Sequence, residues 1–109
     1  MLENSFGLIF FLKVPRHESK IRTVYFRITV DGIPKEASTR RQWDLERWNQ
    51  KTERAVGTKE DAKSLNFFLD SLTSKIHDIK TEILYSGKPI TSQKIMDYVM
   101  GRITPRVKV

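Results

Sequence analysis

The amino-acid sequence indicates an α+β fold: a three-stranded antiparallel sheet backed by a long amphipathic helix, with a short second helix at the C-terminus. Apolar and polar residues alternate over residues 23–30, which is typical of a strand with one buried face. Asp31-Gly32 follows directly and favours a two-residue hairpin turn, because both central positions of that turn need a positive φ. From about Lys59, leucine and isoleucine recur at steps of four and three, the period of a helix with one apolar face.

Three strands are expected within residues 6–42. The first runs from Phe6 to Val14, a segment rich in aromatic and branched residues that ends at a proline. The second covers residues 23–30 and the third about residues 33–41. A tight turn fixes the register of the last two strands and gives these cross-strand pairs: Val30 with Ile33, Arg27 with Glu36, Tyr25 with Ser38, and Thr23 with Arg40.

The segment after the sheet is expected to be mainly helical. Residues 43–48 are expected to form one short helical turn whose two indoles cover an end of the core, and the polar residues 49–58 a loop. A long helix then runs from about residue 59 to residue 85, near a C-capping Gly87. Its apolar stripe is most simply the core that covers the sheet. The helix is nevertheless longer than such strands need, so part of the stripe is available to a second helix or another subunit.

A second helix is expected after the long one. Thr91 is its N-cap, Ile95 and Val99 lie one turn apart, and the helix ends near Met100. The basic tail, residues 102–109, is expected to be a linker.

The chain is strongly basic, with 20 Lys and Arg against 13 Asp and Glu and a net charge of +7 over 109 residues. Such a field attracts polyanions, so nucleic acid is the leading partner. A membrane surface is not expected as a partner, because no basic amphipathic helix or lipid anchor is visible. The sequence has no cysteine and no apolar run long enough to span a bilayer, so a reducing, cytoplasmic location is expected.

Nothing in the sequence indicates catalysis. The two histidines, His17 and His77, lack metal-ligand spacing, and the five glycines are isolated, unlike those of a phosphate-binding loop. The acidic residues are interspersed with basic ones, as on a solvated surface. No catalytic residue, metal ligand or cofactor is therefore expected, and the chain is not expected to be an enzyme.

The informative feature is the polar face of the expected sheet. Opposite an apolar face that includes Ala37, the strands present residue types that bind phosphates and base edges. These are Tyr25, Arg27, Thr29, Ser38 and Arg40, with Lys13, Arg22 and Arg41 at the margins. A narrow antiparallel ribbon can enter the major groove of DNA. The plainer alternative is that any sheet packed on one side shows polar residues on the other, and the residues alone leave the two interpretations even.

Several segments, taken in order, carry a resemblance to a known family. They are Phe11-Leu12-Lys13, Val24 through Gly32, Lys35 through Thr39, Trp43, Trp48-Asn49, Gly57, Ala62 through Asn66, Ile76, and Gly87 through Thr91. Together they resemble the amino-terminal arm-binding domain of tyrosine recombinases, the integrases of conjugative transposons and related bacterial mobile elements. The similarity covers nearly the whole chain. Two departures are Arg40, where glycine is common, and Ala37, where an aromatic residue is often found.

The resemblance implies a DNA-binding module that inserts its exposed sheet face into the major groove of arm-type sites during DNA integration and excision. The resemblance implies DNA contacts by Tyr25, Arg27, Thr29, Lys35, Ser38 and Arg40. The basic residues at the margins of the sheet, Lys13, Arg22 and Arg41, are expected to contact DNA as well. Residues 1–90 would form the arm-type domain, and residues 91–109 a short helix and linker toward core-binding and catalytic regions. The chain is therefore expected to be a recombinase fragment whose partners are double-stranded DNA and the remaining recombinase domains.

Two other functions stay open at this point. The long helix could serve a protein-interaction module or a homo-oligomer through its apolar stripe. Binding of RNA or single-stranded DNA would require more exposed aromatic residues for base stacking than Tyr25 supplies.

Overall fold

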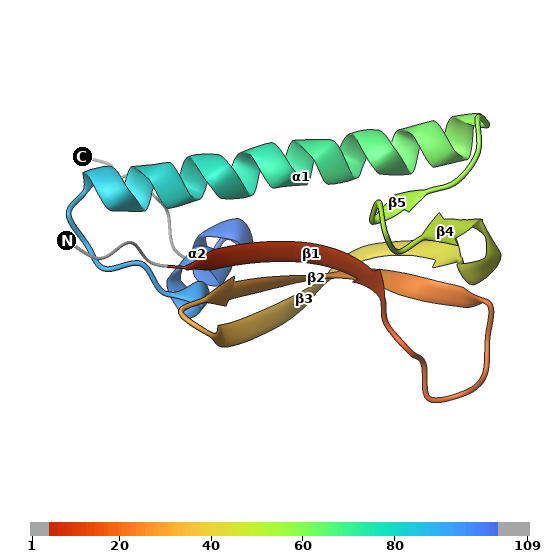
Figure 1. Ribbon diagram of the computed structural model, residues 1–109, viewed down its shortest axis with the longest axis horizontal. Coiled ribbons are helices and arrows are strands. Elements are labelled where there is room, and N and C mark those ends of the chain that lie inside the picture. Colours follow the sequence, from red (N-terminus) through yellow and green to blue (C-terminus); the bar gives the residue numbers. More distant parts are fainter. Residues whose placement is uncertain (1–4, 103–109) are drawn as a thin grey trace.

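The computed structural model describes residues 5–102. The fold has two layers, because both α-helices lie on the same side of the main sheet (Figure 1). It is the expected α+β architecture, with a three-stranded antiparallel sheet, a long helix and a short C-terminal helix.

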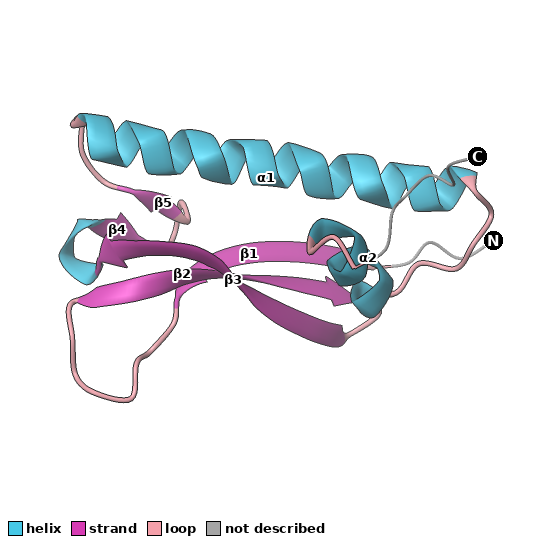
Figure 2. Cartoon of the chain, turned by 180° about the vertical axis from the view of Figure 1, so that it is seen from behind, coloured by secondary structure: helices cyan, strands magenta, loops and turns pink. Residues whose placement is uncertain are grey.

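The main sheet consists of β1 (Phe6–Leu12), β2 (Ile21–Val30) and β3 (Ile33–Asp44), with β2 in the centre and antiparallel neighbours on both sides (Figure 2). The first strand ends before Val14. The third continues past Arg41, because β2 also begins earlier than expected and offers β3 additional partners.

The hairpin between β2 and β3 confirms most of the expected register. Asp31 and Gly32 have φ angles of 52° and 81°, as the tight turn requires. Val30 consequently lies opposite Ile33, and the expected pairs continue as far as Tyr25, which lies opposite Ser38.

Beyond Ser38 the expected register is wrong. Thr23 lies opposite Gln42 and not opposite Arg40. The cause is a β-bulge that inserts Thr39 and Arg40 between two positions of the ladder. Arg40 has a left-handed φ of 65°, and its backbone N–H donates to Ser38 Oγ at 2.8 Å. Thr39 Oγ1 donates to a backbone carbonyl of β2 at 2.7 Å. Side-chain hydrogen bonds therefore replace part of the interrupted ladder.

The segment that contains the two indoles is less helical than expected. Trp43 stays paired with β2, and only a short 3-10 turn, η1 (Leu45–Arg47), follows the sheet. The expected loop contains a small hairpin formed by β4 (Trp48–Asn49) and β5 (Arg54–Ala55). The indoles do cover one end of the core, since Trp43 is buried and Trp48 packs against the core cluster.

Helix α1 (Glu60–Tyr85) confirms the long amphipathic helix. Leu69 and Ile76 are completely buried and share one core cluster with Phe26 of β2. Gly87 follows the helix with a φ of 77°, a conformation that favours glycine at a helix C-terminus. The apolar stripe of α1 is thus used within the chain's own core.

Helix α2 (Ser92–Val99) completes the covered side of the sheet. As expected, Thr91 caps it, because Thr91 Oγ1 accepts a hydrogen bond from the Lys94 backbone N–H at 3.0 Å. Ile95 and Met96 are buried, and α2 contacts β2, β3 and α1. Most of the expected linker, residues 103–109, lies outside the described residues.

Candidate nucleic-acid interface

The main sheet has one face covered by helices and one face that no helix among the described residues covers (Figure 1, Figure 2). Side chains alternate between the two faces along each strand, so the register assigns each strand residue to a face. We call the uncovered side the open face. Its residues include Ile9 and Phe11 of β1, Thr23, Tyr25, Arg27 and Thr29 of β2, and Glu36, Ser38 and Gln42 of β3. Lys13 continues the alternation just after β1.

Five side chains in the middle of the open face contact one another: Phe11, Lys13, Tyr25, Arg27 and Glu36, here called the open-face cluster. Arg27 Nε donates to Glu36 Oε2 at 2.8 Å, and Lys13 Nζ lies 3.4 Å from Glu36 Oε1. The Arg27 guanidinium carbon lies 5.0 Å from the centre of the Phe11 ring. Lys13 Nζ lies 5.2 Å from the centre of the Tyr25 ring. One carboxylate and two aromatic rings therefore hold both cations in place.

The open-face cluster carries two cations against one anion at neutral pH. The hydrogen bond from Arg27 lowers the pKa of Glu36 below its ordinary value, with a smaller contribution from Lys13, and desolvation opposes them. The side chains of Lys13 and Arg27 remain 49% and 38% exposed. Both cations are therefore accessible to a ligand that approaches the open face.

Five of the nine residues expected to contact DNA come together on the open face: Lys13, Tyr25, Arg27, Thr29 and Ser38. The alternation along β2 is regular, because Phe26 and Ile28 are buried on the other side. Arg40 is exposed within the bulge beside these residues. The polar face that the sequence indicates is therefore present and uncovered in the described part of the chain.

Arg22, Lys35 and Arg41 lie on the covered side of the sheet, because the residue opposite each of them is buried. These opposite residues are Trp43, Ile28 and Val24, respectively. The Arg41 guanidinium stacks on a phenylalanine ring of α1, with its carbon 4.0 Å from the ring centre. The charge of Lys35 contributes, after hydrogen bonds led by Arg102, to a lowered pKa of Asp97 on α2. These three cations lie apart from the open-face cluster.

Phe11, Glu36 and Gln42 share the open face, although the sequence does not single them out as site residues. Phe11 lies within a continuous apolar run, which hides its alternation. Gln42 alternates with Ser38 on this face, but it lies just past the end of the third strand expected from the sequence. Glu36 did have a signal, since the expected register already places it beside Arg27.

The loop between β1 and β2 extends the basic surface beyond the strands. It projects away from α1, on the same side as the open face (Figure 1, Figure 2). Arg16 and Lys20 of this loop are exposed. Lys20 Nζ lies 3.6 Å from Glu46 Oε2.

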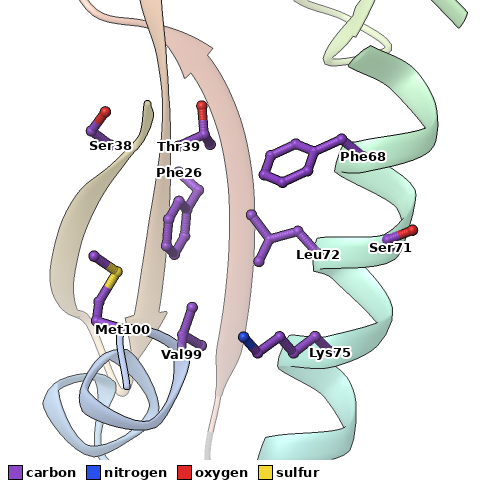
Figure 3. A pocket seen from close by; sticks show the side chains of 9 residues that line it. All are labelled: Phe26, Ser38, Thr39, Phe68, Ser71, Leu72, Lys75, Val99 and Met100. Atoms are coloured by element: carbon purple, nitrogen blue, oxygen red, sulfur yellow. The ribbon is translucent and has the colours of Figure 1, made fainter. Parts of the chain in front are cut away.

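A groove on the covered side is a different kind of surface. It encloses about 300 Å³ between β3, α2 and α1, and Phe68 and Leu72 of α1 project into it toward the sheet (Figure 3). Lys75 is the one charged side chain among the residues shown lining it. Within residues 5–102, no group of three or more His, Asp or Glu side chains could hold a metal ion. In the same part of the chain, no helix is long and apolar enough to cross a membrane.

These features define a class of small α+β domain in which helices cover one face of a three-stranded sheet and cations and aromatic rings occupy the other. A family model described as Arm DNA-binding domain matches residues 18–96, which is more than half of the chain. The chain belongs to this family, the arm-type DNA-binding domain of tyrosine recombinases and integrases, which is a non-catalytic domain. The match confirms the family resemblance seen in the sequence. No curated protein and no solved structure gave a match.

Proposed function

We propose that the chain binds duplex DNA sequence-specifically by inserting its open face into the major groove of arm-type sites. The observation that carries this proposal is the open-face cluster, in which exposed cations are held on a sheet surface that no helix within residues 5–102 covers. Neighbouring strands lie roughly 4.8 Å apart, so the separation of the two outer strand axes is smaller than the width of the major groove, which is about 12 Å. Membership of an arm-type DNA-binding family supports DNA as the ligand.

The proposed roles follow from position. Arg27 reaches base edges, because a guanidinium bonds guanine O6 and N7 well, and Tyr25, Thr29 and Ser38 pack beside it and fix the register. Further cations are proposed to contact the phosphates that flank the groove. Lys13 and Arg40 do so from the open face and the bulge, whereas Arg22, Lys35 and Arg41 reach the phosphates from the covered side of their strands.

The proposal places the chain in the cytoplasm, as part of a site-specific recombinase that integrates and excises mobile DNA. Residues 1–90 then serve as the arm-binding unit. Residues 91–109 lead toward the domains that bind the core site and cut DNA. The alternative in which the long helix mediates self-association has less support, because Leu69, Ile76 and Ile83 of its stripe are buried within the chain.

A salt series tests the proposal. The probe is a duplex selected by the 109-residue chain from a random-sequence pool, compared with a scrambled duplex of equal length and composition. Each phosphate contact should contribute a slope of about −0.9 to the logarithm of affinity against the logarithm of salt concentration. We expect a steep slope for both duplexes and tighter binding of the selected one. A salt-independent affinity, or a selection that yields no consensus, would contradict groove docking.

The same titration with Arg27→Ala tests the residue assigned to base contacts. The variant should weaken binding to the selected duplex by about 1–3 kcal/mol, the range for a bidentate base contact. Arg102→Ala is the matched control, because Arg102 is also an exposed arginine paired with a carboxylate but follows α2. Equal losses in the two variants would leave Arg27 no special role.

A further inference from the structure

We propose that Glu36 is a specificity-determining residue of the open face. On random DNA it weakens the binding of phosphates by Lys13 and Arg27, and at the correct site it accepts a hydrogen bond from a base amino group. This inference rests on the proposed function. It concerns an acidic residue at the centre of a surface whose ligand is a polyanion.

The geometry makes Glu36 the junction of the open-face cluster. One of its oxygens, Oε2, lies 2.8 Å from Arg27 Nε and 2.7 Å from Arg27 Nη2. The other oxygen, Oε1, faces Lys13 Nζ at 3.4 Å. The carboxylate therefore occupies the position that a DNA phosphate would take between these two cations.

This arrangement penalises binding to the phosphate backbone alone. A phosphate that approaches Lys13 and Arg27 meets the negative charge of Glu36 and must compete for donors already in use. Random DNA has few other contacts to make with the open face, since nearly all of its affinity for a protein comes from phosphate contacts. Glu36 thus weakens the binding mode that carries no sequence information.

At the correct site, a hydrogen bond between a base and Glu36 offsets the weakened binding of phosphates. Carboxylates accept hydrogen bonds from the amino group of cytosine in the major groove, where arginine bonds the acceptor edge of guanine. With Arg27 beside it, Glu36 can present an acceptor next to a donor fork. An amino-bearing base, cytosine above all, is therefore the expected partner of Glu36.

The test compares the 109-residue chain with Glu36→Gln, which removes the charge and keeps the side-chain length. Asp70→Asn is the matched control, because Asp70 also pairs with an arginine, at 2.8 Å, but belongs to α1 on the covered side. Each protein is used for a selection from a random duplex pool. Each is then titrated with the wild-type selected duplex and with its scrambled counterpart.

Glu36→Gln should bind the scrambled duplex more tightly and with a steeper salt slope, by about one unit for one more phosphate contact. Its preference for the selected duplex should fall roughly tenfold, and its own selection should lose a preferred amino-bearing base at one position. Asp70→Asn should match the wild type in all four readouts. An unchanged consensus and preference in Glu36→Gln, or equal weakening on both duplexes, would overturn the inference. Failure of the wild type to select any consensus would instead contradict the proposed function itself.

Discussion

Arg27 is ordered before DNA arrives, because the Glu36 carboxylate and the Phe11 ring both contact its guanidinium. Ordering a long side chain at an interface costs roughly 0.5–1.5 kcal/mol. A side chain that is already held loses less of this entropy on binding. If Arg27 binds a base as proposed, the ion pair must share or exchange its donors. At the residue scale, affinity and specificity are therefore expected to depend on the same contact.

Arg40 is under local backbone strain that glycine would relieve. Its φ of 65° lies in the left-handed region, where a residue with a Cβ loses roughly 1–2 kcal/mol. Glycine is common at this position in the family that the sequence resembles. We expect the free energy of unfolding of Arg40→Gly to be about 1 kcal/mol higher than that of Arg40→Ala. Chemical denaturation of the two variants measures it. Both variants lose the same charge, so both should weaken DNA binding alike. Equal stability of the two would contradict the strain.

At the element scale, an ion pair joins η1 to the first turn of α1. Arg47 donates two hydrogen bonds to Asp61, at 2.9 Å and 2.8 Å. This contact, acting against desolvation, lowers the pKa of Asp61 to about 2. Asp61 also lies at the N-terminal end of a helix, where a negative charge is favourable. The contact therefore fastens the start of α1 to the segment that leaves the sheet.

The lowered pKa of Asp61 gives a pH-dependent contribution to stability. The folded pKa lies below the ordinary value of 3.8, so the contribution is complete above that value and is lost as pH falls toward about 2. Asp61→Asn should therefore be less stable than the wild type at neutral pH. The difference should shrink between about pH 4 and about pH 2. Urea unfolding of both proteins across this range measures it, and a difference that is constant with pH would contradict the assignment.

The elements that the sequence predicts well are those with a long periodic pattern or a strong local signal. The stripe of α1, the Asp31-Gly32 turn and the Thr91 cap each depend on neighbouring residues, and each is present. The bulge depends on a hydrogen bond from Thr39 to a distant strand, which no local pattern reveals. Two-residue strands such as β4 are too short to show any periodicity.

The candidate site was predictable to the same extent. Tyr25, Arg27 and Thr29 share a face because simple alternation places them there. Alternation along β3 places Lys35 and Arg41 on the covered side, opposite Ile28 and Val24. Lys35 is expected at the site from the family resemblance and Arg41 from its charge at the margin of the sheet, and neither signal tells which face a side chain shares. The register already placed Glu36 beside Arg27, but an acidic residue in a basic surface is easily taken for ordinary solvation.

At the scale of the whole molecule, the fold separates the packed core from the surface proposed to bind DNA. Both helices and the core lie on one side of the main sheet, and the open-face cluster lies on the other (Figure 1). Substitutions in the core should therefore affect binding through stability, whereas substitutions on the open face should affect binding directly. Lysine residues on both sides of the sheet allow this separation to be measured.

Lysine acetylation of the 109-residue chain, with and without the selected duplex, tests most directly whether the open face binds DNA. Mass spectrometry then reports the reactivity of each lysine. Lys13 lies on the open face and Lys20 is exposed in the loop between β1 and β2, whereas Lys63 and Lys75 are exposed on α1. DNA should protect Lys13 strongly and Lys20 partly, while Lys63 and Lys75 stay as reactive as in the free protein. Protection of the two α1 lysines with Lys13 left reactive would contradict the open face as the DNA-binding surface.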